Sequence, residues 1–143
     1  MYLRFPFEDG AETLDFMPLS MRRKLDLAGV KINLAGWQAL SRAERLALAH
    51  FPVESREERD AFTEVLRGFC TRASVKVEPL PGGPIDGSGW SAQRVPDAVR
   101  ARRDIPPARW SALGDEERYI LLRLAEKQRG AERFDAAVQS LGL

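Results

Sequence analysis

Apolar side chains recur every three or four residues along most of the chain, with polar residues between them. This spacing is typical of amphipathic helices and predicts an all-α protein. The clearest example is the stretch from Phe62 to Cys70, where Phe62, Leu66, Phe69 and Cys70 share one helix face. Helices are expected over residues 18–28, 42–51, 55–73, 96–105, 115–128 and 132–141, with a short helical turn around 37–40.

Local sequence signals mark the helix ends. Ser41-x-x-Glu44 and Ser55-x-x-Glu58 are capping boxes, in which a serine and a glutamate bond the free backbone N–H groups of a helix start. Pro18 suits the first helical position, because its missing N–H would have no partner there. Gly29 supplies the left-handed residue that ends the same helix.

The pattern also predicts the core. Segments 46–49 and 119–122 are apolar nearly all round, so we expect their two helices to pack against each other. Gly68 lies inside a long helix, where glycine is unfavourable, and is expected to mark a close helix crossing. The side chains expected to be buried together are Leu46, Leu48, Phe62, Leu66, Phe69, Ile120, Leu121, Leu124 and Val138.

Two stretches of the chain, residues 17–51 and 95–124, share a series of matched positions. Such self-similarity indicates a duplicated architecture, and two copies are too few for a solenoid. We therefore expect a compact domain of two pseudo-repeated helical halves related by an approximate internal twofold axis. The matched residues interpreted as structural anchors are Pro18 and Pro96, Trp37 and Trp110, and Arg45 and Arg118.

The 143 residues suit one domain, 1–143, that is long enough for a real core. Within it we expect an N-terminal arm over 1–16, a first helical half over 17–74, a Gly/Pro-rich linker over 75–94 and a second helical half over 95–143. Phe5, Phe7 and Phe16 are expected to anchor the arm onto the helical body. Three prolines and four glycines between residues 75 and 89 exclude a helix in the linker.

Composition narrows the classes of function. The net charge is +1, so no overall electrostatic attraction to nucleic acid or membranes is expected. Cys70 is the only cysteine and His50 the only histidine, which excludes an internal disulfide, a cysteine-based zinc site and a multi-histidine metal site. The N-terminus does not resemble a signal peptide, and no apolar run approaches the ~20 residues that span a bilayer. We therefore expect a cytoplasmic protein.

Motifs of established enzyme classes do not occur in the sequence. There is no Gly-x-Ser-x-Gly elbow, no P-loop and no His-Glu-x-x-His sequence. Carboxylates are frequent at the expected helix starts, where they cap backbone N–H groups and complement the helix dipole. We therefore expect no catalytic residue, no metal site and no cofactor, and a protein that is not an enzyme.

Two basic runs, residues 22–24 and 100–103, occupy matched positions in the two halves. Brought together by a twofold axis, they would form one positive face suited to phosphate or carboxylate. The alternative is two solvated helix faces. Trp90, in the linker, is the best aromatic candidate for a partner contact. The residues expected to bind a partner or an anion are Arg22, Arg23, Lys24, Asp26, Trp90, Arg100, Arg102 and Arg103.

The first half carries a specific motif: Met17-Pro18-x-x-x-Arg22-x-Lys24-Leu25-Asp26-x-x-Gly29-Val30-Lys31-Ile32, followed by Trp37-x-x-Leu40-Ser41-x-x-Glu44-Arg45. Together with the Phe-x-Phe-Glu opening at residues 5–8, the segment 90–96 and the ending 136–143, it resembles the nitrate reductase associated protein family. The resemblance covers nearly the whole chain. That family tends to carry a His-Glu-Asn run where this chain has Ala131-Glu132-Arg133, which argues against a histidine-dependent role.

The resemblance implies a helical accessory protein, encoded near genes for assimilatory nitrate reductase and the molybdenum cofactor. It implies a protein partner, either a nitrate reductase or the molybdenum-cofactor machinery, and less directly a pterin phosphate bound by the arginines. Two alternatives stay open: a nucleic-acid-binding or regulatory helical module that uses the basic runs, and an unrecognised small-molecule binder or enzyme. A salt series tests the nucleic-acid alternative, because binding to a phosphate backbone falls steeply with salt.

Overall fold

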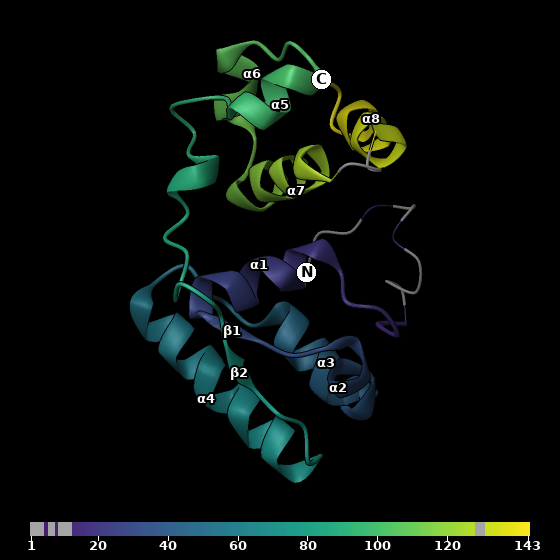
Figure 1. The fold of residues 1–143 in the computed structure, drawn as a ribbon, viewed down its shortest axis with the longest axis vertical. Coiled ribbons are helices and arrows are strands. Elements are labelled where there is room, and N and C mark those ends of the chain that lie inside the picture. The colour runs from purple at the N-terminus through teal and green to yellow at the C-terminus, as the bar shows by residue number, and fades with distance from the viewer. Residues whose placement is uncertain (1–4, 6–7, 9–12, 128–130) are drawn as a thin grey trace. The chain divides into compact units, whose positions relative to one another are not determined.

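The computed structural model describes residues 5, 8, 13–127 and 131–143. Within these ranges the chain is mostly helical, and its sheet consists of two short strands (Figure 1). The predicted all-α class is confirmed. The described chain divides into two compact units: unit 1 contains Glu8 and residues 13–86, and unit 2 contains Phe5 and the described residues from Gly87 onward. The boundary falls inside the predicted linker, and the single domain over 1–143 stays a prediction.

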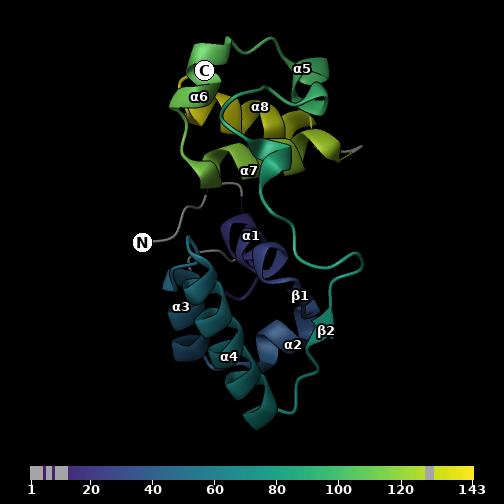
Figure 2. The ribbon, with the colours of Figure 1, turned by 90° about the vertical axis from the view of Figure 1, so that its left-hand side faces the viewer.

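Unit 1 contains four α-helices and both strands among its described residues. Helices α3 and α4 pack against α1, and the two strands pair antiparallel, with Val30 opposite Pro79 and Lys31 opposite Glu78 (Figures 1 and 2). In chain order the elements are α1 (Leu19–Ala28), β1 (Val30–Lys31), α2 (Leu34–Ala39), α3 (Arg42–His50), α4 (Arg56–Arg72) and β2 (Glu78–Pro79).

The end of α1 requires a glycine at position 29, as the sequence predicted. Gly29 has φ 77°, in the left-handed region. A Cβ atom at this position would lie 2.6 Å from Cγ of Pro84, so the loop crosses the backbone too closely for any side chain. The same loop closes the helix end, because Leu80 N–H donates to Gly29 O at 2.9 Å and Ile85 N–H donates to Asp26 O at 3.0 Å.

The helix starts follow their predicted signals. Ser41 and Glu44 exchange reciprocal hydrogen bonds at the start of α3, and Ser55 and Glu58 do so at the start of α4. Both capping boxes are therefore confirmed. Pro18 is the residue before the first helical position, one place earlier than predicted.

Unit 2 is built around α7 (Asp115–Glu126), which packs against α5 (Asp97–Arg102) and α8 (Ala131–Ser140). A 3₁₀ turn, η1 (Ser88–Trp90), also contacts α7, and α6 (Pro107–Ala112) lies between α5 and α7 in the chain. The helix predicted over 96–105 is shorter and ends at Arg102. The new helix α6 begins at Pro107, where the fixed φ of proline suits the first turn.

The predicted core residues are divided between the two units. Leu48, Phe62 and Leu66 are buried in unit 1, whereas Ile120, Leu121, Leu124 and Val138 are buried in unit 2. That these residues form one shared cluster stays a prediction. Leu46 is 44% exposed and Phe69 is half-buried, so these two residues do not belong to the fully buried core.

Within its own unit, helix α3 packs with α1 and α4, and α7 packs with α5, α8 and η1, so the predicted contact between α3 and α7 stays a prediction. Two other packing predictions need correction. Gly68 marks no crossing, because an added Cβ would meet no atom within 4 Å. Phe5 is buried as expected, but Phe16 is 47% exposed; Phe7 lies outside the described residues.

Ser74, two residues after the end of helix α4, has an unfavourable backbone conformation. Ser74 has φ 57°, and Val75 N–H closes the helix end on Cys70 O at 2.8 Å. Glycine adopts this left-handed geometry without the steric cost that a Cβ brings, about 1–2 kcal/mol. We expect Ser74→Gly to raise the free energy of unfolding by roughly 0.5–1 kcal/mol after the entropy of glycine in the unfolded chain is subtracted.

Urea denaturation measures this change, and Ser74→Ala is the matched control. Alanine removes the hydroxyl but keeps the Cβ, so its stability should stay close to that of the unaltered protein. A glycine variant no more stable than the alanine variant would contradict the assigned cost of the backbone conformation, whereas equal losses in both variants would show that the Ser74 hydroxyl governs stability at this position.

Candidate functional site

Lys24, a predicted binding residue, is buried at the end of helix α3. Its side chain is 6% exposed, and its ammonium group donates to the carbonyl oxygens of Phe51 at 2.7 Å, Leu48 at 3.4 Å and Ala49. The last carbonyls of a helix have no partner inside the helix, and a cation there also complements the helix dipole. Lys24 therefore stabilises α3, and the expectation that it lies on an exposed positive face was wrong.

The neighbours of Lys24 in the first basic run differ in exposure. Arg23 is buried and pairs with Glu54, with 3.1 Å between Nη2 and Oε1. Asp26 is also buried. Arg22 alone of the four predicted residues of this run is exposed. The surface that this run offers to a partner is thus much smaller than the sequence predicts.

The second basic run is exposed, but its guanidinium groups bind other parts of unit 2. Arg102 donates to Ala125 O at 3.2 Å and Lys127 O at 2.6 Å at the end of α7. Arg103 donates to Leu143 O at 3.0 Å. Arg102 in unit 2 and Lys24 in unit 1 hold matched positions, and both donate hydrogen bonds to carbonyl groups at a helix end that have no partner within the helix.

Arg100, the remaining member of the second run, pairs with Asp97 on the same helix, and Arg94 pairs with the same carboxylate at 3.1 Å. The hydrogen bond from Arg100 and the charge of Arg94 hold the pKa of Asp97 below its ordinary value. All three side chains face solvent, where such pairs contribute little stability. Arg100 is therefore still accessible to an anionic partner.

The matched tryptophans act as predicted, as anchors inside their own units. Trp37 is fully buried, and its Nε1–H donates to Leu14 O at 2.8 Å. Trp110 is fully buried, and its Nε1–H donates to Ser91 O at 2.8 Å. In each unit the indole ties the segment before the first helix to the short helix that carries the tryptophan.

The matched arginines bind the same two segments. Arg45 Nη1 donates to Leu14 O at 2.7 Å, and Arg118 Nε donates to Trp90 O at 2.9 Å. Arg118 also donates to Leu113 O. The repeat positions therefore make comparable contacts within each unit. The matched prolines, Pro18 and Pro96, both stand directly before a helix. The internal twofold axis itself stays a prediction.

Trp90 is buried rather than displayed. It is 3% exposed and meets Tyr119 edge to face, with 4.9 Å between ring centroids. Its carbonyl is the acceptor for Arg118, and its Nε1–H is buried without a hydrogen-bond partner among the described residues. Its expected exposure was wrong, because the linker leads directly into the core of unit 2.

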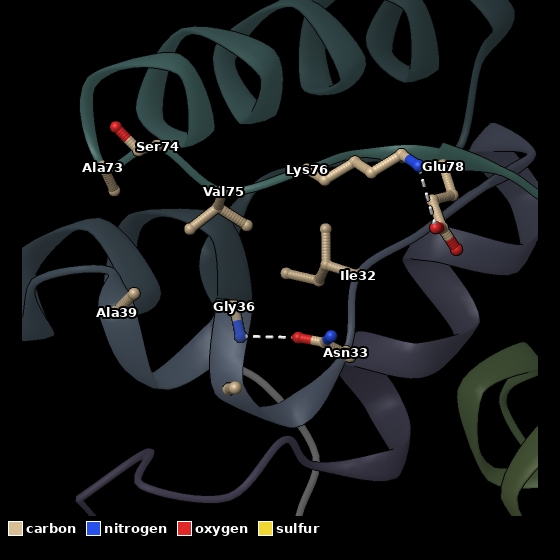
Figure 3. Close-up of a pocket in the computed structure, with 10 residues that line it drawn as sticks. Ile32, Asn33, Gly36, Ala39, Ala73, Ser74, Val75, Lys76 and Glu78 are labelled. Atoms are coloured by element: carbon tan, nitrogen blue, oxygen red, sulfur yellow. Dashed lines mark hydrogen bonds and ion pairs between the residues drawn. The ribbon is translucent and has the colours of Figure 1, made fainter.

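An open hollow lies on the surface of unit 1. Figure 3 shows the side chains that line it, which come from the β1–α2 segment on one side and from the end of α4 to β2 on the other. Its volume is about 330 Å³. The lining residues are Ile32, Asn33, Ala35, Gly36, Ala39, Ala73, Ser74, Val75, Lys76 and Glu78.

The backbone of Gly36 forms one wall of this hollow. A Cβ atom on Gly36 would lie 2.7 Å from Cγ1 of Val75, so only glycine permits the two walls to approach so closely. Asn33 caps α2 by accepting a hydrogen bond from Gly36 N–H at 2.7 Å. The shape of the hollow is therefore fixed by a helix cap and by a glycine that the sequence did not single out.

Charged side chains stand at one rim. Glu78 pairs with Lys76 at 3.5 Å and with Lys31 at 3.7 Å. One carboxylate thus faces two ammonium groups, which leaves the rim with a surplus of one positive charge. These side chains are 44–82% exposed, so a partner can replace either ion pair at small cost.

The other chemistry-bearing side chains lie apart from this hollow. Burial raises the pKa of the Cys70 thiol, the charge of Glu44 adds to this shift, and Arg67 partly opposes it. A thiol with a raised pKa is a poor nucleophile, because the thiolate is the reactive form. No group of three or more His, Cys, Asp or Glu side chains within the described ranges is placed to hold a metal ion.

Fold and site together define a small helical protein with a surface hollow of the size that takes a side chain or a small ligand. The chain belongs to the conserved nitrate reductase-associated protein family, whose model matches residues 4–141. No curated protein and no solved structure matches the chain. None of its described helices combines the length and the apolar character needed to cross a membrane.

The predicted site and the hollow share no residue. Charge runs and a tryptophan are visible locally in the sequence, whereas the hollow is formed by mostly small residues from two distant segments. One signal was present: Gly36 stands directly before the predicted helical turn and lies inside α2, where glycine is disfavoured unless close packing requires it.

Proposed function

We propose that this protein is a non-catalytic accessory protein that binds nitrate reductase in the cytoplasm and acts in its maturation, assembly or regulation. The observation that carries the proposal is membership of the nitrate reductase-associated family over residues 4–141. The name of that family states an association with the enzyme. Direct binding to the enzyme is the simplest physical explanation of such an association.

The use of the basic residues narrows the surface on which a partner can bind. Lys24, Arg102 and Arg118 each donate to backbone carbonyl groups of their own unit. Groups committed in this way support the fold and are not available to substrate. The hollow of unit 1, the exposed Arg22 and the solvent-facing Arg100 are accessible to another molecule.

Two measurements test the proposal. The purified protein, immobilised, should capture purified nitrate reductase from the same cells, and a strain that lacks the protein should show reduced nitrate reductase activity that the gene restores. The molybdenum content of the enzyme from that strain separates a role in cofactor delivery from a role in assembly or regulation. Absence of capture together with unchanged nitrate reductase activity in the deletion strain would overturn the proposal.

A further inference from the structure

We infer that the hollow between α2 and residues 73–78 is a docking groove for an extended segment of a partner protein, with an acidic residue next to an apolar one. The inference rests on the proposed function, since it names the surface that a partner would contact. Four observations carry it: the shape of the hollow, a backbone amide without a partner, the apolar lining and the charge of the rim.

The shape follows from the way two paired strands separate. After the last bridge pair, Lys31 opposite Glu78, one chain turns into α2 at Asn33 and the other leads back to the end of α4 at Ser74. The hollow is the wedge between them, as Figure 3 shows. Its length along residues 73–78 suits an extended chain.

The backbone of β2 continues into the wedge without a partner. Leu80 N–H donates to Gly29 O, so alternate residues of this extended stretch, Glu78 and Lys76, direct their backbone groups toward the same side. The amide of Lys76 has no backbone hydrogen bond to the described residues. A segment that enters the wedge in extended form can accept this hydrogen bond, which is the basis of recognition by strand addition.

The lining suits one apolar side chain. Ile32, Ala35, Ala39, Ala73 and Val75 supply apolar surface, and the volume of about 330 Å³ is at the lower end of the range for ligand pockets. This space holds a side chain and part of its backbone rather than a folded element. Leu34, which precedes the lining residue Ala35 in the chain, is also an exposed apolar side chain, 47% accessible.

The charge of the rim determines which residue is favoured next to the apolar side chain of the bound segment. Lys76 is 82% exposed and shares Glu78 with Lys31, so a carboxylate from a partner gains a positive group whose present ion pair is weak. A basic residue in the same place would meet the surplus charge of the two lysines. The groove therefore favours an acidic-apolar segment over a basic-apolar one.

Short synthetic peptides test the groove independently of nitrate reductase. Two peptides differ only in carrying an Asp-Leu or a Lys-Leu centre, and binding is followed by the NMR shifts of the backbone amides. We expect the Asp-Leu peptide to shift the amides of Ile32, Gly36 and Lys76 and to bind about tenfold more tightly than the Lys-Leu peptide, a difference of ~1.4 kcal/mol. Lys76→Glu should reverse this preference.

Two further variants complete the test. Ala39→Phe fills the hollow and should abolish peptide binding, with circular dichroism as the check on folding. Arg56→Glu makes the same charge change on the exposed start of α4, away from the hollow, and should bind the Asp-Leu peptide like the unaltered protein. Absence of shifts at the three amides with either peptide would overturn the groove, as would shifts that depend only on protein concentration and so indicate a second copy of the chain.

The same variants separate the groove from the proposed function. Nitrate reductase captured equally by the unaltered protein, Lys76→Glu and Ala39→Phe would overturn the groove as the contact surface and leave the association intact. Peptide binding without capture of the reductase would support the groove and overturn the proposed partner.

Discussion

Replacing Leu121 with alanine is expected to lower the free energy of unfolding by about 2–5 kcal/mol. Leu121 is fully buried in α7, the helix that contacts α5, α8 and η1 in unit 2. The loss combines the transfer free energy of the removed atoms with the cavity that neighbouring helices leave unfilled. Urea denaturation followed by circular dichroism measures it.

Leu46→Ala is the matched control for this prediction. This substitution makes the same Leu-to-Ala change at a position of α3 where the side chain is 44% exposed. The free energy of unfolding should therefore fall by no more than about 0.5 kcal/mol. Since the chain forms two units, the transition should also be followed by tryptophan fluorescence, to which Trp90 and Trp110 contribute from unit 2 and Trp37 from unit 1. Equal losses for the two leucines would show that Leu121 does not pack as described.

Lys24→Met is expected to cost roughly 1–3 kcal/mol, the penalty for leaving buried backbone acceptors without a donor. Methionine retains the length and apolar stem of lysine but cannot donate to the carbonyls of Leu48, Ala49 and Phe51. The end of α3 then loses its cap. Thermal and urea denaturation of the purified variant measure the loss.

The control for Lys24 lies two residues earlier on the same helix. Arg22→Met also removes one positive charge, but Arg22 is exposed, so its effect on stability should be within about 0.5 kcal/mol. The pair separates the cap from the general effect of charge. A Lys24 variant as stable as the Arg22 variant would contradict the role assigned to the buried ammonium group.

Features that depend on a few neighbouring residues were predictable from the sequence. The capping boxes at Ser41 and Ser55 and the glycine at position 29 involve contacts within one or two helical turns, so their residue types carry the information. The anchor roles of Trp37 and Trp110 were also predicted, because two copies of one pattern indicated a shared purpose.

Features that depend on which helix meets which were not predictable. Leu46 and Leu48 stand two residues apart in an evenly apolar segment, and only the direction of α1 and α4 decides that Leu48 is buried and Leu46 exposed. In the sequence, Lys24 has the pattern of a charged surface run, because no neighbouring residue indicates that its ammonium group contacts the carbonyls at the end of α3. Burial of a charge is a tertiary property.

The groove was beyond sequence reasoning for a further reason. Its strands have two residues each, too short for any alternating pattern to appear. Its walls come from residues 32–39 and 73–78, and the pairing of β1 with β2 and the approach of Gly36 to Val75 bring them together. A single sequence contains the residue types but not their proximity.

The loop closure at Gly29 has a consequence for synthesis of the protein. A chain leaves the ribosome N-terminus first, so α1 emerges long before the amides of Leu80 and Ile85 that bond the carbonyls at its end. Contacts between residues far apart in the chain also form slowly. Unit 1 is therefore completed only after α4 and the following loop have been translated, and until then the carbonyl groups of Asp26 and Gly29 lack the amides of Ile85 and Leu80 as partners.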